Sequence, residues 1–390
     1  MRGTPSLIRK INRSNIIGLI RKNGSLSRSE IARITGLSLP SVSRIIDSLI
    51  QEGILKEVGK GDSPRGKKPL LIDINSDHQY VFGVEISRKG QIILCNLIGT
   101  VLEREQFFPD PSQGPGSIAK QLSNEISRLS HLFNLKPNKV AGIGIGTPGF
   151  LFKAGPLINQ SPFFGWNSIN AVQVFERSFS YPVLVENVAK ASALAEKMYG
   201  YGKQFEDFFY IYTDWGVGGG FVTGGALYRG INGNAGEFGH TIIQQNGVPC
   251  YCGNLGCIEQ YTSTDAIVRE AKSINKNIKD FDSVMAAYQH DDSKIISILK
   301  KSGEILGKGI ANIINLLNPE AVIIGGEFAR KCPVYIQSAT EQARDAVFSL
   351  EARNTPIFTS QLGEEAVAIG MASEVISEFI NENLPIDQED

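Results

Sequence analysis

The chain has 390 residues, of which 42% are hydrophobic and 20% charged, the composition of a folded protein with two or three domains. No apolar run approaches the roughly 20 residues of a membrane-spanning helix, and no apolar core follows the basic N-terminus, so a membrane span and a secretory signal are both disfavoured. Residues 1–70 hold 14 basic and 5 acidic side chains, a net charge of +9, whereas the remainder has −10, and this basic head on an acidic body favours a polyanionic partner for the head alone.

Three amphipathic helices are predicted in the first 52 residues. The first ends at Gly24, because glycine commonly follows a helix C-terminus. Ser27 and Glu30 have the spacing of a capping box, which predicts the start of the second helix. The third helix begins at Ser38 or Leu39 and has a proline in its first turn. Its predicted buried face comprises Val42, Ile45, Ile46, Leu49 and Ile50.

Two short strands are predicted after these helices, at residues 54–58 and 70–74, and their pairing would form the wing of a winged helix-turn-helix domain over residues 1–75. The N-terminal side chains of a recognition helix contact base edges, and basic flanks hold phosphates. The basic segment 65–69 resembles an AT-hook, a short arm that enters a narrow minor groove. A plain helical bundle with a solvated basic linker is the alternative, which the net +9 disfavours. The predicted contacts to double-stranded operator DNA are Arg28, Pro40, Ser41, Ser43, Arg44, Arg65, Lys67 and Lys68.

The body alternates short apolar strands with helical stretches, which predicts an α/β fold with helix-covered sheets. Strands are predicted at 80–86, 91–97, 139–145, 182–186, 208–212 and 320–325, and long helices at 117–132 and 297–317. Glycine-rich turns are expected to follow strands at 142–149, 213–220 and 325–326. Such turns let the backbone approach a phosphate or a sugar, although a single one is more often ordinary turn chemistry.

Three of the five cysteines are grouped with one histidine, in the set His240, Cys250, Cys252 and Cys257. An odd cysteine count clustered this tightly is a poor disulfide framework and indicates a metal site in a reducing cytoplasm. One imidazole and three thiolates complete a tetrahedral site with no open position, so we expect a structural Zn²⁺. The isolated Cys95 is expected to be a core thiol, and the other three histidines are expected to be ordinary packed or surface residues.

The segment 237–240, followed by the block 250–259, resembles the zinc-and-sugar signature of the ROK family (repressor, open reading frame, kinase). The likeness covers nearly the whole chain and is closest to the DNA-binding regulators of that family. It implies a two-lobed actin/hexokinase-like (ribonuclease H-like) domain, with a smaller lobe at residues 76–185 plus about 370–390 and a larger lobe, which contains the zinc motif, at 186–369. It also implies sugar ligands at Asn187, Glu237, His240 and Glu259.

The chemistry of these residue types agrees with that implication, since carboxylates and amides suit pairs of hydroxyls and a zinc-bound imidazole keeps its second nitrogen free. Trp166 and Asn167 resemble a further segment near the sugar, with packing in the core as an equal alternative for Trp166.

Two departures from the kinases of this family argue against phosphoryl transfer. Those kinases use an aspartate in an E-N-D segment as general base, and the corresponding residue here is Val188. Loss of a positioned base commonly lowers the rate by a factor of roughly 10² to 10⁴. The turn at 84–90 also lacks the paired glycines and the threonine of the kinases' D-x-G-G-T phosphate turn. We therefore predict a sugar sensor that has no catalytic residues and is not an enzyme, and the loss of the aspartate leaves the identity of the sugar open.

Together these features predict a cytoplasmic transcriptional repressor of carbohydrate uptake or catabolism genes, which binds its operator as a homodimer or tetramer. A small sugar bound between the lobes would change the spacing of the two heads through a joint at residues 59–69. Two alternatives stay open. One is an ATP-dependent sugar kinase with an appended DNA-binding domain, and the other is a regulator controlled by a transporter protein.

Overall fold

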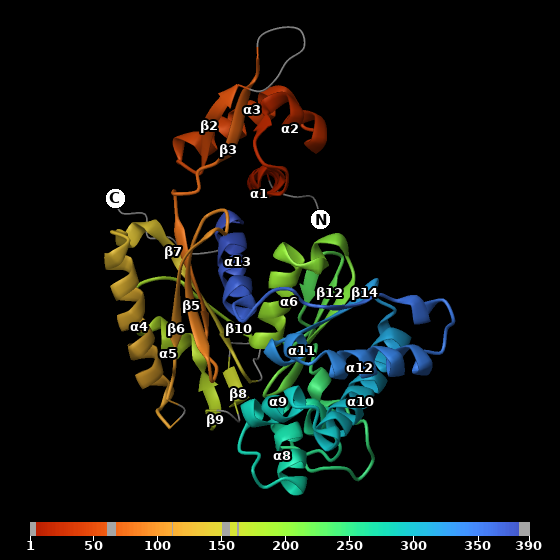
Figure 1. Ribbon diagram of the computed structural model, residues 1–390. Coiled ribbons are helices and arrows are strands. Elements are labelled where there is room, and N and C mark those ends of the chain that lie inside the picture. Colours follow the sequence, from red (N-terminus) through yellow and green to blue (C-terminus); the bar gives the residue numbers. More distant parts are fainter. Residues whose placement is uncertain (1–4, 61–67, 111, 150–156, 162–163, 382–390) are drawn as a thin grey trace.

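The computed structural model describes residues 5–60, 68–110, 112–149, 157–161 and 164–381. A small head lies above the junction of a two-lobed body (Figure 1). The head comprises α1 (Pro5–Asn23), β1 (Leu26–Ser27), α2 (Arg28–Thr35), α3 (Leu39–Gln51), β2 (Leu55–Lys60) and β3 (Leu70–Ile74). Its strands are antiparallel in the order β1-β3-β2, so the predicted winged helix-turn-helix is confirmed.

The head helices begin and end at the residues that cap them. Ser27 begins α2: its side chain accepts the Glu30 N–H at 3.3 Å, and the Glu30 carboxylate accepts the Ser27 N–H at 2.9 Å, which confirms the capping box. Gly36, at φ +72°, ends this helix in the left-handed conformation that glycine adopts without strain. Ser38 caps α3. The buried core of the head combines its three helices and its sheet. It comprises Ile16, Ile17, Ile20, Ile31, Val42, Ile46, Leu49, Leu55 and Ile72, with Ile45 and Ile50 half-buried at its edge.

The predicted joint at residues 59–69 is wrong. β2 and β3 are hydrogen-bonded to each other along their length, so the chain between them connects two strands of the head. The head joins the body after β3, where Asn75 donates its backbone N–H to the Ile54 carbonyl and its side-chain amide to the Gly53 carbonyl, both at 2.9 Å. The glycines and charges of 59–69 are typical of a linker, but the two strands that flank the segment are paired within the head.

The first lobe is built on a five-stranded sheet in the order β10-β7-β4-β5-β6. Its strands are β4 (Tyr80–Glu85), β5 (Gly90–Asn96), β6 (Val101–Phe107), β7 (Val140–Thr147) and β10 (Val183–Asn187). α4 (Pro115–Leu132) and α5 (Ala171–Glu176) cover one face, and α13 (Ala366–Ile380) covers the other (Figure 1). A short helix, η1 (Pro137–Lys139), and a hairpin of β8 (Leu157–Ser161) and β9 (Trp166–Asn170) accompany them.

The second lobe has another five-stranded sheet, in the order β13-β12-β11-β14-β15. Its strands are β11 (Phe208–Thr213), β12 (Val217–Thr223), β13 (Ala226–Tyr228), β14 (Ala321–Gly325) and β15 (Ile357–Thr359). Its helices are α6 (Val188–Tyr199), α7 (Glu259–Thr262), α8 (Thr264–Ile274), α9 (Phe281–Gln289), α10 (Ser293–Leu317), α11 (Glu327–Lys331) and α12 (Pro333–Ala346), with the short η2 (Tyr201–Gln204), η3 (Phe238–His240) and η4 (Ala352–Asn354). Alternate residues of β11 face opposite cores, one shared with α6 and one with α10 and α12.

α6 and α13 cross between the two sheets, and glycines make the approach close. A Cβ on Gly370 of α13 would lie 1.8 Å from the Ala191 carbonyl oxygen of α6, and one on Gly144 of β7 would lie 2.4 Å from the Met371 carbonyl oxygen. Two of the predicted glycine-rich turns are therefore wrong in large part, because residues 142–147 belong to β7 and residues 217–220 to β12. Their glycines serve helix-on-sheet packing.

The predicted α/β architecture is confirmed, whereas the residue boundaries of the two lobes stay a prediction. Within the described ranges, no helix is both long and apolar enough to cross a membrane.

Candidate metal centre and adjoining cavity

Four side chains that can ligate a metal lie together beside β12. His240 ends η3, and the three cysteines lie on the loop before α7. That loop folds back on itself through β-bridges between Ile242 and Cys257 and between Pro249 and Leu255. The structure thus brings together the whole predicted set, His240, Cys250, Cys252 and Cys257, with all ligand atoms within 4.8 Å of one another.

The spacing inside this cluster fits a tetrahedral zinc ion. Bonds of about 2.3 Å to sulfur and about 2.0 Å to nitrogen place tetrahedral ligands roughly 3.5–3.8 Å apart. The Cys252 and Cys257 sulfurs are 3.6 Å apart, and Cys250 Sγ lies 3.5 Å from His240 Nδ1. Burial lowers the pKa of His240, which favours the neutral imidazole that binds metals, and burial raises the pKa of the Cys250 and Cys257 thiols. Thiolates buried in this way need a cation beside them, so the cluster could hold a metal ion.

A cavity of about 300 Å³ opens next to the cluster, where the start of α6, the β11–β12 turn and the cysteine loop meet. All four predicted sugar ligands line it: Asn187, Glu237, His240 and Glu259. They come from separate parts of the chain, at the end of β10, at η3 and at the start of α7. The fold therefore places them around one volume, in agreement with the resemblance that implied them.

Asn187 lies at the N-terminus of α6 and caps it. Its side-chain oxygen accepts the Ala189 N–H at 2.8 Å, and its amide nitrogen donates to the Gly149 carbonyl at 3.0 Å. An amide has a second lone pair and a second N–H, so Asn187 can cap the helix and contact a ligand in the cavity.

Glu237 is held next to a buried lysine. Burial raises the pKa of Glu237 to about 7. The negative charges of Glu259 and Glu186 act in the same direction, and the positive charge of Lys190 opposes them. Lys190 Nζ lies 3.9 Å from Glu237 Oε1 and donates to the Gly233 carbonyl, although only 1% of this lysine is exposed. Lys190 is one helical turn beyond Asn187, so the first turn of α6 carries one predicted ligand and the counter-ion of another.

His240 and Glu259 are joined by a tyrosine that sequence reasoning missed. The Tyr251 hydroxyl lies 3.0 Å from His240 Nε2 and is near enough to the Glu259 carboxylate to influence its pKa. Glu259 also accepts the Val217 N–H at 2.9 Å, and burial raises its pKa to about 7. Tyr251 lies between Cys250 and Cys252 in the sequence, and this position inside the predicted metal motif is the signal that could have marked it as a residue of the site.

Val188 lines the same cavity at the first helical position of α6, with 6% of its surface exposed. Its methyl groups lie at the position where the kinases of the family that this chain resembles carry their general base. A valine neither accepts nor donates a proton.

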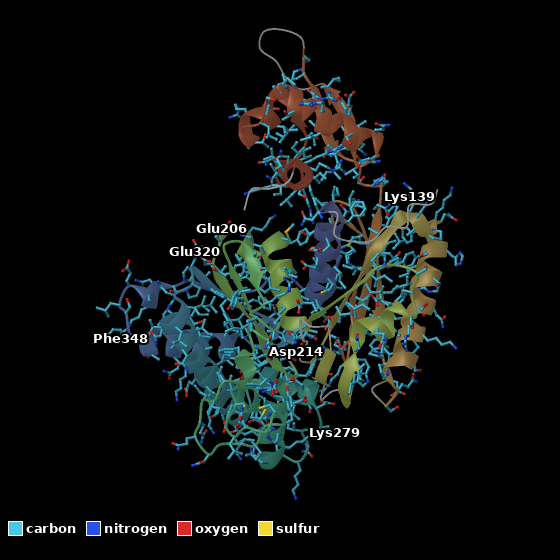
Figure 2. The ribbon with its side chains drawn as sticks, turned by 180° about the vertical axis from the view of Figure 1, so that it is seen from behind. Lys139, Glu206, Asp214, Lys279, Glu320 and Phe348 are labelled. Atoms are coloured by element: carbon cyan, nitrogen blue, oxygen red, sulfur yellow. The ribbon has the colours of Figure 1, made fainter. Side chains whose placement is uncertain are left out.

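A second cavity, of about 580 Å³, adjoins the first and has many acidic side chains. Burial raises the pKa of Glu85 to about 8 and that of Asp214 to about 6, and Asp214 lies centrally in the body (Figure 2). The β4–β5 turn at the edge of this cavity is not a phosphate-binding loop. Instead, Arg88 makes a two-bond ion pair with Asp265 of α8, at 2.7 and 2.9 Å.

In the head, the predicted DNA contacts divide into three groups. Pro40, Ser41, Ser43 and Arg44 lie at the start of α3, and Arg44 is exposed. Arg28 donates to Asp47 at 2.7 Å and to Glu57 at 3.3 Å, so its guanidinium already bridges α3 and the wing. Lys68 is exposed beside β3, and Arg65 and Lys67 lie outside the described residues.

Trp166 belongs to the core rather than to the cavity lining. It stacks on Phe164 with ring centroids 4.4 Å apart and is 4% exposed, within the cluster that packs on the first sheet. Of the two readings of this residue, core packing is the one that the contacts favour.

Comparison with known proteins agrees with this geometry. The ROK family profile matches residues 81–378, and a winged helix-turn-helix DNA-binding profile matches residues 9–56. The chain is 30% identical over 377 residues to the xylose repressor of Bacillus subtilis (strain 168), which covers 96% of this chain and 97% of that protein. It is 26% identical over 388 residues to the DNA-binding transcriptional dual regulator NagC of Escherichia coli (strain K12), covering 97% of this chain and 95% of NagC.

A solved structure with the same fold is that of a ROK family transcriptional regulator, a homologue of the E. coli MLC protein. The TM-score is 0.82 at 24% sequence identity, and the match covers 96% of this chain and 97% of the other.

Proposed function

The chain belongs to the ROK family, and on that premise we propose that it is a DNA-binding transcriptional repressor of carbohydrate uptake or catabolism genes, controlled by a sugar. One observation carries the proposal. Four polar side chains, Asn187, Glu237, His240 and Glu259, face one cavity of about 300 Å³ in a chain that begins with a winged helix-turn-helix domain. The xylose repressor that this chain matches along nearly its full length supports repression as the effect on the target genes.

The cavity suits a free monosaccharide. Its two carboxylates accept hydrogen bonds from pairs of hydroxyls, whereas the asparagine amide and the imidazole N–H donate to them. The Glu237 and Glu259 side chains stand on different elements, so a ring bound between them would contact both η3 and α7. Because a named relative is a xylose repressor, a pentose is the first sugar to test.

We propose that the body does not phosphorylate this sugar. Val188 provides no base at the place where one is needed. The lining of the larger cavity has more acidic than basic side chains, with Asp280, Asp282 and Glu364 among the acidic ones, so a polyphosphate there would meet charges of its own sign. Arg88, which lines both cavities, is already paired with Asp265.

A Zn²⁺ ion would have a structural role. His240 Nδ1 and the sulfurs of Cys250, Cys252 and Cys257 would hold it, and a metal with four protein ligands adds folding free energy without an open position for chemistry. The cysteine loop and η3 would then be fixed to each other. Such an ion would orient His240 so that Nε2 faces the cavity.

Control of the head is proposed to pass through α6 and α13. α6 starts at the sugar ligand Asn187 and ends at Tyr199, whose hydroxyl accepts a hydrogen bond from Arg21 of α1 at 3.3 Å. The end of α13 packs in the same apolar core as α1, and Ser14 donates to its Ile380 carbonyl at 3.4 Å. These contacts replace the joint that the sequence suggested in the wing.

Operator binding is proposed to use the start of α3 together with the basic wing, from the cytoplasm and in a dimer or tetramer. Ser41, Ser43 and Arg44 would read base edges, and Lys68 with the wing arginine and lysine would hold phosphates or the minor groove. Arg28 would act mainly by fixing α2 against α3 and the wing, since two carboxylates already engage it.

The experiment that tests the proposal measures affinity for DNA from the chain's own promoter region by fluorescence anisotropy, with and without xylose, glucose and N-acetylglucosamine. One of these sugars should weaken operator binding in the wild type but not in Glu237→Gln, which keeps the shape of the side chain and loses its charge. No change with any sugar would contradict control by a sugar and leave DNA binding intact. ATP-dependent phosphorylation of a sugar by the wild type above the Glu237→Gln level would favour the kinase alternative, and capture of a transporter protein from sugar-fed cells would favour the other.

A further inference from the structure

The sugar cavity contains a hydroxyl group supplied by the chain itself. Tyr251 lines the cavity, and its hydroxyl lies between His240 on η3 and Glu259 on α7. Both partners are proposed sugar ligands. A group that satisfies two ligands at once occupies the place where a ligand atom would lie.

The hydrogen-bond directions in this contact are those of a sugar hydroxyl. His240 Nδ1 lies 3.5 Å from the Cys250 sulfur, and when Nδ1 serves the cysteine cluster the imidazole hydrogen is on Nε2, which can donate to the Tyr251 oxygen 3.0 Å away. The Tyr251 O–H keeps its own hydrogen for an acceptor, and the neighbouring Glu259 carboxylate can supply one. A tyrosine hydroxyl and a sugar hydroxyl each donate one hydrogen bond while accepting another, so one can replace the other.

The tyrosine side chain is free to leave this position. It is 41% exposed and makes an edge-on contact with the His240 ring, at 85° and 5.1 Å between centroids, so it is not packed in a core. Its backbone, in contrast, is anchored on both sides by Cys250 and Cys252. The side chain can therefore swing out of the cavity while the loop that carries it stays in place.

We propose, resting on the proposed sugar response, that Tyr251 determines sugar affinity as an internal competitor: its hydroxyl occupies the His240–Glu259 position in the sugar-free protein and is displaced by a hydroxyl of the bound sugar. Binding then exchanges one pair of hydrogen bonds for another, so the net gain at this position is small. The sugar concentration that relieves repression is thereby raised. A tyrosine at residue 251 sets the threshold of the sensor, whereas the neighbouring ligands set which sugar is read.

Tyr251→Phe tests this, because it removes the hydroxyl and retains the ring. Isothermal titration of the full chain with xylose, glucose and N-acetylglucosamine should show about three- to tenfold tighter binding of the responding sugar in Tyr251→Phe, the range that the loss of one competing hydrogen bond gives. Tyr228→Phe, on the exposed strand β13, is the matched control and should bind like the wild type. The metal content should equal that of the wild type in both variants.

Each result has a distinct meaning. Equal or weaker binding in Tyr251→Phe, with normal metal content, would overturn the competitor role, and weaker binding would make Tyr251 a direct sugar contact. Binding by Tyr251→Phe alone, with none by the wild type, would support the competitor role in its strongest form. If the wild type binds a sugar and Tyr251→Phe does not bind it more tightly, only this inference fails. If neither protein binds any of the three sugars, the sugar response itself fails and the inference with it.

Discussion

Replacement of Glu85 by glutamine should make the protein more stable at alkaline pH. Glu85 ends β4 with 5% of its surface exposed, and burial raises the pKa of its carboxyl from 4.5 to about 8. Between those two pH values the native protein retains a proton that the unfolded chain has released. The free energy of unfolding therefore falls as the pH rises, by about 1.4 kcal/mol for each pH unit.

The magnitude follows from the same pKa. Below pH 4.5 the carboxyl is protonated in both states and contributes no pH dependence. From pH 6 to pH 8 the destabilisation by Glu85 grows by about 2 kcal/mol, because the slope applies until the carboxyl ionises in the native state near pH 8. Glu85→Gln has no proton to release, so its advantage over the wild type should grow by that amount across this interval.

Urea denaturation at pH 6, 7 and 8 measures this difference. Glu364→Gln is the matched control, because Glu364 lines the same cavity but is exposed. Parallel pH profiles for the wild type and Glu85→Gln would refute the reasoning, since they would mean that the buried carboxyl ionises at the same pH in both states.

Three further outcomes are expected. Cys252→Ser should lose about one equivalent of bound zinc, as measured by mass spectrometry of the purified protein, whereas Cys95→Ser in the first-lobe core should retain it; equal metal content in the two variants would contradict the site. Gly370→Ala should lower the free energy of unfolding by about 1–3 kcal/mol through the collision with the Ala191 carbonyl, whereas Gly116→Ala in α4, where a Cβ meets open space, should not. Operator binding should weaken by a factor of about 10³ to 10⁵ between 50 and 200 mM salt if six to ten phosphates are contacted, while sugar affinity in titration calorimetry stays nearly constant; a flat salt profile for DNA would mean that the net +9 head does not hold phosphates.

Features that depend on short sequence signals were predictable. The Ser27–Glu30 capping box and the metal cluster follow from spacing alone, because the interacting groups are close in sequence or have few chemical uses. The predicted sugar ligands required the family resemblance, because Asn187 and Glu237 are 50 positions apart in the chain and line one cavity only after folding.

Features that depend on distant contacts were missed. Lys190 is an unremarkable helix residue until Glu237, 47 positions later, is placed against it. The glycines of β7 resemble a phosphate loop in sequence, and only the approach of α13 shows that they serve packing. The wing strands were predicted correctly, but the segment between them was also predicted to be a joint, because glycine and charge are common to wings and linkers.

The place of α13 at the end of the chain has a consequence for synthesis. This helix covers one face of the first-lobe sheet, to which β4 belongs. Yet about 280 residues separate Glu85, at the end of β4, from Ala366, at the start of α13. At about 5–20 residues per second, that interval is on the order of 15–60 seconds of translation. The residues of the helix-turn-helix head are all synthesised within the first 74 positions, whereas α13, which shares an apolar core with α1, is synthesised last. A chain that ends before Ala366 would contain the whole DNA-binding head but lack the helix against which α1 packs.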